Sequence, residues 1–128
     1  MSMANYLEDE LLDHIFGTGA WSAPATRYIG LHTADPGETG ATAEVSGNNY
    51  SRATENGWGA SSGGAIANSG IVTFATPSGS WGVVTHITVW DAVSGGNCLF
   101  VGALAASKTI EASDPVTFPV GDLDITLE

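Results

Sequence analysis

The hydrophobic residues of this chain recur with two different periods, one near the N-terminus and another over the rest. The first apolar residues are spaced three and four apart and form one stripe: Leu7, Leu11, Leu12, Ile15 and Phe16. This spacing predicts an amphipathic helix over about residues 3–16. Acidic residues occupy much of its remaining surface. The apolar stripe either packs on a sheet of the same chain or docks onto a neighbouring subunit.

The ends of this helix also have sequence signals. Asn5 followed by Glu8 resembles a capping arrangement, in which side chains bond the first free backbone N–H groups. Gly17 and Gly19 follow the last apolar residue and are expected to end the helix.

From residue 27 onward, short stretches rich in β-branched and aromatic residues alternate with turn signals. About seven strands are predicted: residues 27–33, 50–54, 71–75, 83–91, 98–105, 116–118 and 123–127. Two polar, glycine-rich stretches without periodicity are expected to form long surface loops, at 34–49 and 55–70. The expected fold is mainly β, an antiparallel β-sandwich or small barrel preceded by one N-terminal amphipathic helix. A single domain over 1–128 is expected, with helix and turn in 1–19 and the β-sandwich in 27–128.

The second half of the chain has the most regular pattern. Strands 83–91 and 98–105 flank a turn and form the best hairpin candidate, and the second, apolar on both faces, is expected to be central. Prolines on both sides of 116–118 mark an edge strand. The last strand alternates, with three residues expected to point inward: Leu123, Ile125 and Leu127.

The amino-acid composition and net charge argue against two classes of binding partner. The net charge is −11, with only three Lys and Arg residues. Nucleic-acid binding depends on Lys and Arg that neutralise phosphates, so nucleic acid and anionic membrane are not expected partners. No secretory signal and no stretch of about 20 apolar residues is present, so the protein is expected to be made and kept in a cytoplasm until it is assembled or released.

A search for reactive groups finds no pattern typical of an enzyme. The three histidines lack metal-ligand spacing, and a Cys98–His86–Asp91 nucleophile has no supporting motif. Asp122 and Asp124 share one face of the last strand and leave calcium binding open, although solvent-facing positions explain them more simply. We therefore expect no catalytic residues, no cofactor and no metal site.

The single cysteine, Cys98, precludes an internal disulfide and lies in an apolar run. Such a cysteine is typically a small buried hydrophobe. A bridge between two copies of the chain is the alternative.

Four tryptophans bear on binding. Trp90 lies in a strand and is expected in the core, whereas Trp58 and Trp81 lie in Gly/Ser-rich stretches. A large aromatic side chain there is expected to serve an interface or cover the core, with carbohydrate stacking as the alternative. The residues expected to make contacts with partners are Leu7, Leu11, Ile15, Trp21, Trp58 and Trp81.

Several segments resemble a family of small tailed-phage and prophage proteins commonly labelled phage tail fibre proteins. The resemblance covers almost the whole chain and is carried by YIGLHTADPG (28–37), EVSGNNYSR (44–52), SWGVVTHI (80–87), DAVSGGN (91–97), GAL (102–104), SKT (107–109) and GDLDITL (121–127). It implies a non-enzymatic structural protein of the virion.

The resemblance leaves the place in the virion open. The sequence contains no tandem repeat or coiled coil of the kind that builds a fibre shaft. A compact domain with a docking helix favours an accessory or decoration (cement) protein, bound in many copies to the capsid surface. A tail fibre or tail-tip protein that contacts a host glycan or receptor is the alternative. The expected partners are other virion proteins, either the major capsid protein or tail proteins, and further copies of the chain, with a trimer possible.

Overall fold

The computed structural model describes residues 1–127 and contains one helix and nine short strands. The elements in chain order are β1 (Ser2–Met3), α1 (Asn5–Phe16), β2 (Tyr28–His32), β3 (Ala53–Thr54), β4 (Ala65–Ala67), β5 (Val72–Thr73), β6 (Gly82–Trp90), β7 (Cys98–Ile110), β8 (Thr117–Phe118) and β9 (Asp124–Thr126). The mainly β fold with one N-terminal helix is confirmed.

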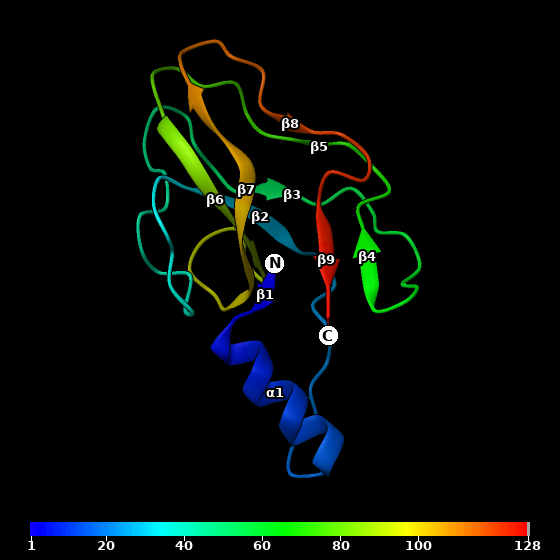
Figure 1. The fold of residues 1–128 in the computed structure, drawn as a ribbon. Helices are drawn as coiled ribbons and strands as arrows, with labels where there is room; N and C mark the ends of the chain where they lie inside the picture. The colour runs from blue at the N-terminus through cyan, green and yellow to red at the C-terminus, as the bar shows by residue number, and fades with distance from the viewer. Residues whose placement is uncertain (128) are drawn as a thin grey trace.

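The main sheet is antiparallel and five-stranded, in the order β1-β7-β6-β2-β3. Its centre is β6, which pairs with β2 on one side and with β7 on the other. The predicted hairpin is therefore confirmed, but β7 is not the central strand. On the side away from β6, β7 pairs only with the two-residue β1, so most of β7 lies at the edge of the sheet (Figure 1).

Two small antiparallel ribbons, β4–β9 and β5–β8, pack on one face of this sheet. Alternation along β2 directs Ile29 and Leu31 to that face, and both are almost completely buried. From the ribbons, Val72, Leu123 and Ile125 meet them. The main hydrophobic core thus lies between the sheet and the ribbons.

The opposite face of the sheet is covered by loops and not by a second sheet. There, Trp90, Cys98 and Val101 form a small second cluster with Ala4 at the start of the helix. The loop after β2 covers the same face, where Gly40 lies against Trp90 and Cys98, and then returns beside β2, where Glu44 forms an isolated bridge with His32.

Helix α1 leaves the sheet at its β1–β7 edge and extends away from the strands (Figure 1). The predicted capping arrangement is wrong, because Ala4 precedes the helix and no side chain caps it. Instead, the Ala4 N–H donates to the Leu99 carbonyl and the Asn5 N–H to the Glu38 carbonyl. The backbone of the body thus holds the start of the helix. Its end at Gly17, in the left-handed conformation, is as expected.

Two other expectations about strands are wrong. The stretch 55–70, expected as an irregular loop, contains β4, whose three residues pair with β9. Leu127 was expected to point inward, but it follows the end of β9 and its side chain is 46% exposed.

Candidate functional site

The C-terminal half of α1 is the most exposed apolar surface among the described residues. Leu7, near the start of the helix, is 5% exposed and belongs to the main core. Exposure then rises along the helix, to 56% at Leu12, 64% at Ile15 and 76% at Phe16. Leu7 is therefore a core residue and not a contact residue, whereas Ile15 is available to a partner.

The apolar surface of the helix is wide, and only part of it faces the sheet. Leu7 and Leu12 are five residues apart, which places them about 140° apart around the helix axis. The side with Leu7 faces the sheet, and Leu11 beside it is half-buried. Leu12 and Phe16, four residues apart, share the outer side. A groove of about 220 Å³ lies between these sides, lined by Met3, Glu8, Leu11, Leu12 and Ile15.

Trp81 is buried in the structure and Trp21 is half-buried. Trp81 is 4% exposed and packs edge-on against Tyr50, with ring centroids 5.3 Å apart. Its Nε1–H donates to the Asn48 carbonyl oxygen at 2.9 Å. Trp81 is therefore a core residue, and not a surface contact. Trp21 is half-buried against the core, and its backbone N–H donates to Nδ1 of His14.

Trp58 is half-buried and lines a crevice of about 380 Å³ between the main sheet and the β4–β9 ribbon. The other lining residues are Arg27, Ile66, Val89, Phe100 and Ile125. Arg27 is already bonded to Glu55, and the Trp58 Nε1–H donates to the same carboxylate. A sugar needs several free polar partners, and this crevice offers few, so it suits an apolar side chain better than a glycan.

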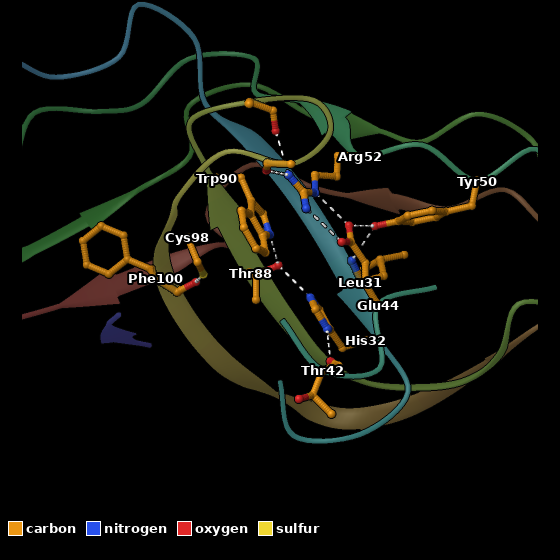
Figure 2. Close-up of polar contacts among 12 residues, drawn as sticks. Leu31, His32, Thr42, Glu44, Tyr50, Arg52, Thr88, Trp90, Cys98 and Phe100 are labelled. Atoms are coloured by element: carbon orange, nitrogen blue, oxygen red, sulfur yellow. Dashed lines mark hydrogen bonds and ion pairs between the residues drawn. The ribbon is translucent and has the colours of Figure 1, made fainter. Parts of the chain in front are cut away.

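A buried polar network lies on the loop-covered face of the sheet (Figure 2). Arg52, 8% exposed, donates from Nε and Nη2 to the two carboxylate oxygens of Glu44, at 2.7 and 2.9 Å. Its Nη1 donates to the carbonyls of Ala92 and Gly95 in the β6–β7 turn. One arginine therefore joins the loop after β2 to the β6–β7 turn. No candidate residue chosen from the sequence belongs to this network.

The electrostatics of this network indicate a structural role. Burial alone would raise the pKa of Glu44, but hydrogen bonds from Arg52 and Tyr50 outweigh it and hold the pKa below its usual value. Burial raises the pKa of the Tyr50 hydroxyl, which donates to Glu44. Among residues 1–127, no buried side-chain nitrogen or oxygen lacks a hydrogen-bond partner. The network has no spare group directed at a ligand.

His32 is fully buried beside this network. Nδ1 lies 2.8 Å from the Thr42 carbonyl oxygen, so it is the protonated nitrogen, and Nε2 accepts from the Thr88 hydroxyl at 2.9 Å. Burial lowers the pKa of His32. The imidazole is thus a neutral hydrogen-bonded connector between the sheet and the loop after β2.

The residues of the possible nucleophile site are not brought together. Cys98 pairs with Trp90, whereas His86 pairs with Ala103 further along the hairpin. Burial raises the pKa of the Cys98 thiol to about 12, so the thiolate is scarce at neutral pH. Asp91 instead accepts from Asn97 and closes the β6–β7 turn.

The bridge between copies through Cys98 also conflicts with the structure, because Cys98 is buried, with 3% of the residue exposed. No cluster of three or more His, Cys, Asp or Glu side chains suited to a metal occurs in the described part of the chain. Asp122 and Asp124, the possible calcium ligands, are both exposed. No helix in residues 1–127 is long and apolar enough to cross a membrane.

A comparison with models of protein families identifies a match along almost the whole chain. A family model described as "Podophage GP4 fiber I protein gp80" matches residues 2–126, from β1 to the end of β9. No curated protein matches the chain. The family description supports the fibre alternative more than capsid decoration.

Proposed function

Because this chain belongs to the podophage GP4 fiber I protein family, we propose that it is a non-enzymatic structural part of a tailed-phage fibre that acts through contacts with other proteins. The observation that carries the proposal is the match over residues 2–126, which includes the helix and all nine strands. Family membership implies a place in the virion. It also supports other virion proteins as partners.

The contact surface in this proposal is the outer part of α1. Leu12, Ile15 and Phe16 lie close together on one helix end and are mostly exposed, and a contiguous exposed apolar patch is typical of an interaction site. Leu11 and Trp58, which line an apolar groove and an apolar crevice, are secondary contact candidates.

A structural role also agrees with the chemistry of the polar groups. The Arg52–Glu44 pair, His32 and Asp91 are each bonded within the fold, and the Cys98 thiol is buried and protonated. These groups hold loops on the sheet and leave no nucleophile beside a base. Binding of a host glycan at Trp58 is disfavoured by the apolar lining of its crevice.

The experiment that tests the proposed function is localisation in purified virions of the phage that encodes the chain. Gold-labelled antibodies against the chain, followed by cryo-electron microscopy, are expected to mark a fibre. Virions with gold spread over the capsid lattice, or with none, contradict the proposal. Purified major capsid protein shells without tails are the control for non-specific labelling.

Capsid decoration is the second candidate, and one observation favours it. Within residues 1–127 the only helix has 12 residues, so the described part contains no coiled-coil shaft. Labelling over the capsid in the same experiment selects this candidate over the fibre.

A further inference from the structure

We propose that the exposed end of α1 docks into a hollow at the opposite end of a second copy, so that copies join head to tail. This inference rests on the proposed function only in taking the outer side of α1 as a contact surface. It names the occupant of that surface, which is another copy of the chain.

The outer side of α1 has both apolar and acidic groups. Asp9 is three residues before Leu12 and seven before Phe16, so the three side chains share one side of the helix. The helix holds four acidic residues in all and no Lys or Arg. Its partner must therefore combine an apolar surface with a positive charge.

The same chain has a hollow with these properties. A cavity of about 390 Å³ opens between the far half of β7 and β8. Val84, Ile110 and Val116 form its buried apolar floor, and Leu104 and Phe118 are partly exposed at its wall. A cavity of this size is within the range that holds a small ligand or a few side chains. Docking an amphipathic helix in an apolar groove is a common mode of recognition.

Lys108 supplies the positive charge at the edge of this hollow. The chain has three Lys and Arg residues, and Arg27 and Arg52 are paired with glutamates. Lys108 is exposed and makes no ion pair within residues 1–127. Asp122 also lines the hollow, so a docked helix has to place Asp9 towards Lys108 and away from Asp122. The charges thus select one orientation of the helix.

The helix cannot reach the hollow of its own chain. It begins beside Leu99, to whose carbonyl the Ala4 N–H is bonded, whereas the hollow lies along residues 104–110 of the same strand. Leu99 and Leu104, the nearest residue of the hollow on this strand, are five residues and about 17 Å apart. In addition, α1 points away from the end of the molecule where β7 meets β8 (Figure 1). The occupant of the hollow must come from another molecule.

Charge also argues against a symmetric contact between two helices. Such a contact would bring two sets of four acidic residues together without any Lys or Arg. Docking of the helix into the hollow is a heterologous contact, because it joins two different surfaces of the chain. Every added copy therefore leaves one helix or one hollow free to bind the next copy. Such a contact builds an open row of copies, or a ring where the rotation closes. A row explains how a short chain without repeats contributes to a fibre.

The first experiment measures self-association of the purified full chain by sedimentation velocity from about 1 µM to about 1 mM, the range expected for a small interface. The mean mass is expected to rise with concentration.

The variant with both Leu12→Ser and Phe16→Ser should associate at least about tenfold more weakly, since the burial of one such side chain already contributes more than a factor of ten to the association constant. Lys108→Glu should weaken it as well. Val93→Ser, at an exposed apolar position in the β6–β7 turn, is the matched control and should change nothing.

The second experiment mixes two variants, each defective at one end. The Leu12→Ser/Phe16→Ser chain retains its hollow, and the Lys108→Glu chain retains its helix. Alone, each should stay monomeric at concentrations where the unchanged chain associates. Mixed, they should form a one-to-one dimer that does not grow. A chain with both Asp9→Lys and Lys108→Glu should associate again, because the charge pair is restored with reversed signs.

Three outcomes overturn the inference. They are a chain that stays monomeric up to about 1 mM, an association that the substitutions leave unchanged, and variants that do not complement each other when mixed. Circular dichroism of each variant verifies the fold, and all substituted side chains are exposed. A monomeric chain that still labels the fibre of virions removes this inference and leaves the proposed function intact. Association in solution without labelling of virions removes the proposed function and leaves this inference intact.

Discussion

The guanidinium of Arg52 lies over the indole ring of Trp90, with Cζ 3.7 Å from the ring centroid. Both side chains are buried, and the indole Nε1–H donates to Thr88, which in turn donates to His32. The stacked cation therefore connects the Glu44 ion pair to the hydrogen bonds at the centre of the sheet. An arginine is suited to this position because a planar group can stack and bond a carboxylate at once.

Replacement of Arg52 by Ala is expected to lower the free energy of unfolding by about 2–4 kcal/mol, because it leaves the partly buried Glu44 carboxylate unpaired. Urea denaturation followed by circular dichroism measures the loss. Lys108→Ala is the control, since Lys108 is exposed and makes no ion pair within residues 1–127. It should cost about 1 kcal/mol or less. Equal losses in the two variants contradict the role given to Arg52.

Strands that are rich in β-branched residues could be predicted, because their own residues favour the extended conformation. The β6 sequence is dense in β-branched residues, and it folds as expected. In contrast, β4 reads Ala-Ile-Ala after two glycines, with a single large side chain. It becomes a strand because it pairs with β9, almost 60 residues later, and a local pattern contains no such information. The choice between interface and core could not be made for Trp81 for a similar reason, since its Gly/Ser-rich neighbours give no sign of its contacts with Tyr50 and Phe74.

The candidate site could be predicted in part. The spacing of apolar residues correctly predicts the helix, but it does not show where the sheet ends beneath it. Leu7 lies over β7 and is buried, whereas Phe16 lies beyond the sheet and is exposed. The Arg52–Glu44 pair was missed because the two residues are eight positions apart along the chain, and only the folded loop brings them together.

Protonation of His32 is expected to destabilise the fold at mildly acidic pH. Burial lowers its pKa, so the unfolded chain binds a proton near pH 6.5 while the folded chain still resists it. The stabilisation is complete above about pH 6.5 and is lost as the pH falls towards the pKa of the folded state. Thermal melts between about pH 7.5 and 5.5 should show a falling Tm. His32→Gln should flatten this dependence, and His14→Gln, on the exposed part of α1, should retain it. A slope that survives His32→Gln contradicts the assignment.

Gly40 and Gly37 offer a matched pair for the packing of the loop after β2. Both have φ near +70°, where an L side chain is strained. A Cβ at Gly40 would lie 2.6 Å from Sγ of Cys98, whereas at Gly37 it would meet nothing within 4 Å. Gly37→Ala should therefore cost about 1–2 kcal/mol for the backbone alone. Gly40→Ala should cost about 1–3 kcal/mol more, from overpacking against the second cluster. Urea denaturation of both variants tests whether this loop is packed as described.

Two tryptophans are expected to respond differently to truncation. Trp81→Ala removes a side chain enclosed by Tyr50 and Phe74 and should destabilise the fold by about 3–5 kcal/mol. Trp58→Ala opens a crevice that is already accessible, so the isolated fold should persist while assembly into virions weakens. Thermal melts and incorporation into virions measure the two effects separately. Loss of the fold in Trp58→Ala would place Trp58 among the core residues.

The Cys98 thiol is expected to be unreactive in the folded chain. It is 3% exposed and its pKa is raised to about 12 by burial, so both access and thiolate are lacking. Ellman's reagent should release no colour from the native protein, and one equivalent per chain in denaturant. Val93→Cys in a Cys98→Ala background presents a thiol at an exposed position of the same hairpin and should react at once. Native labelling of Cys98 at a rate that follows reagent concentration, and not the rate of unfolding, would show that the loop over the second cluster opens. The same burial predicts that oxidised samples contain no covalent dimer on a non-reducing gel, and a dimer there would restore the bridge between copies that the structure argues against.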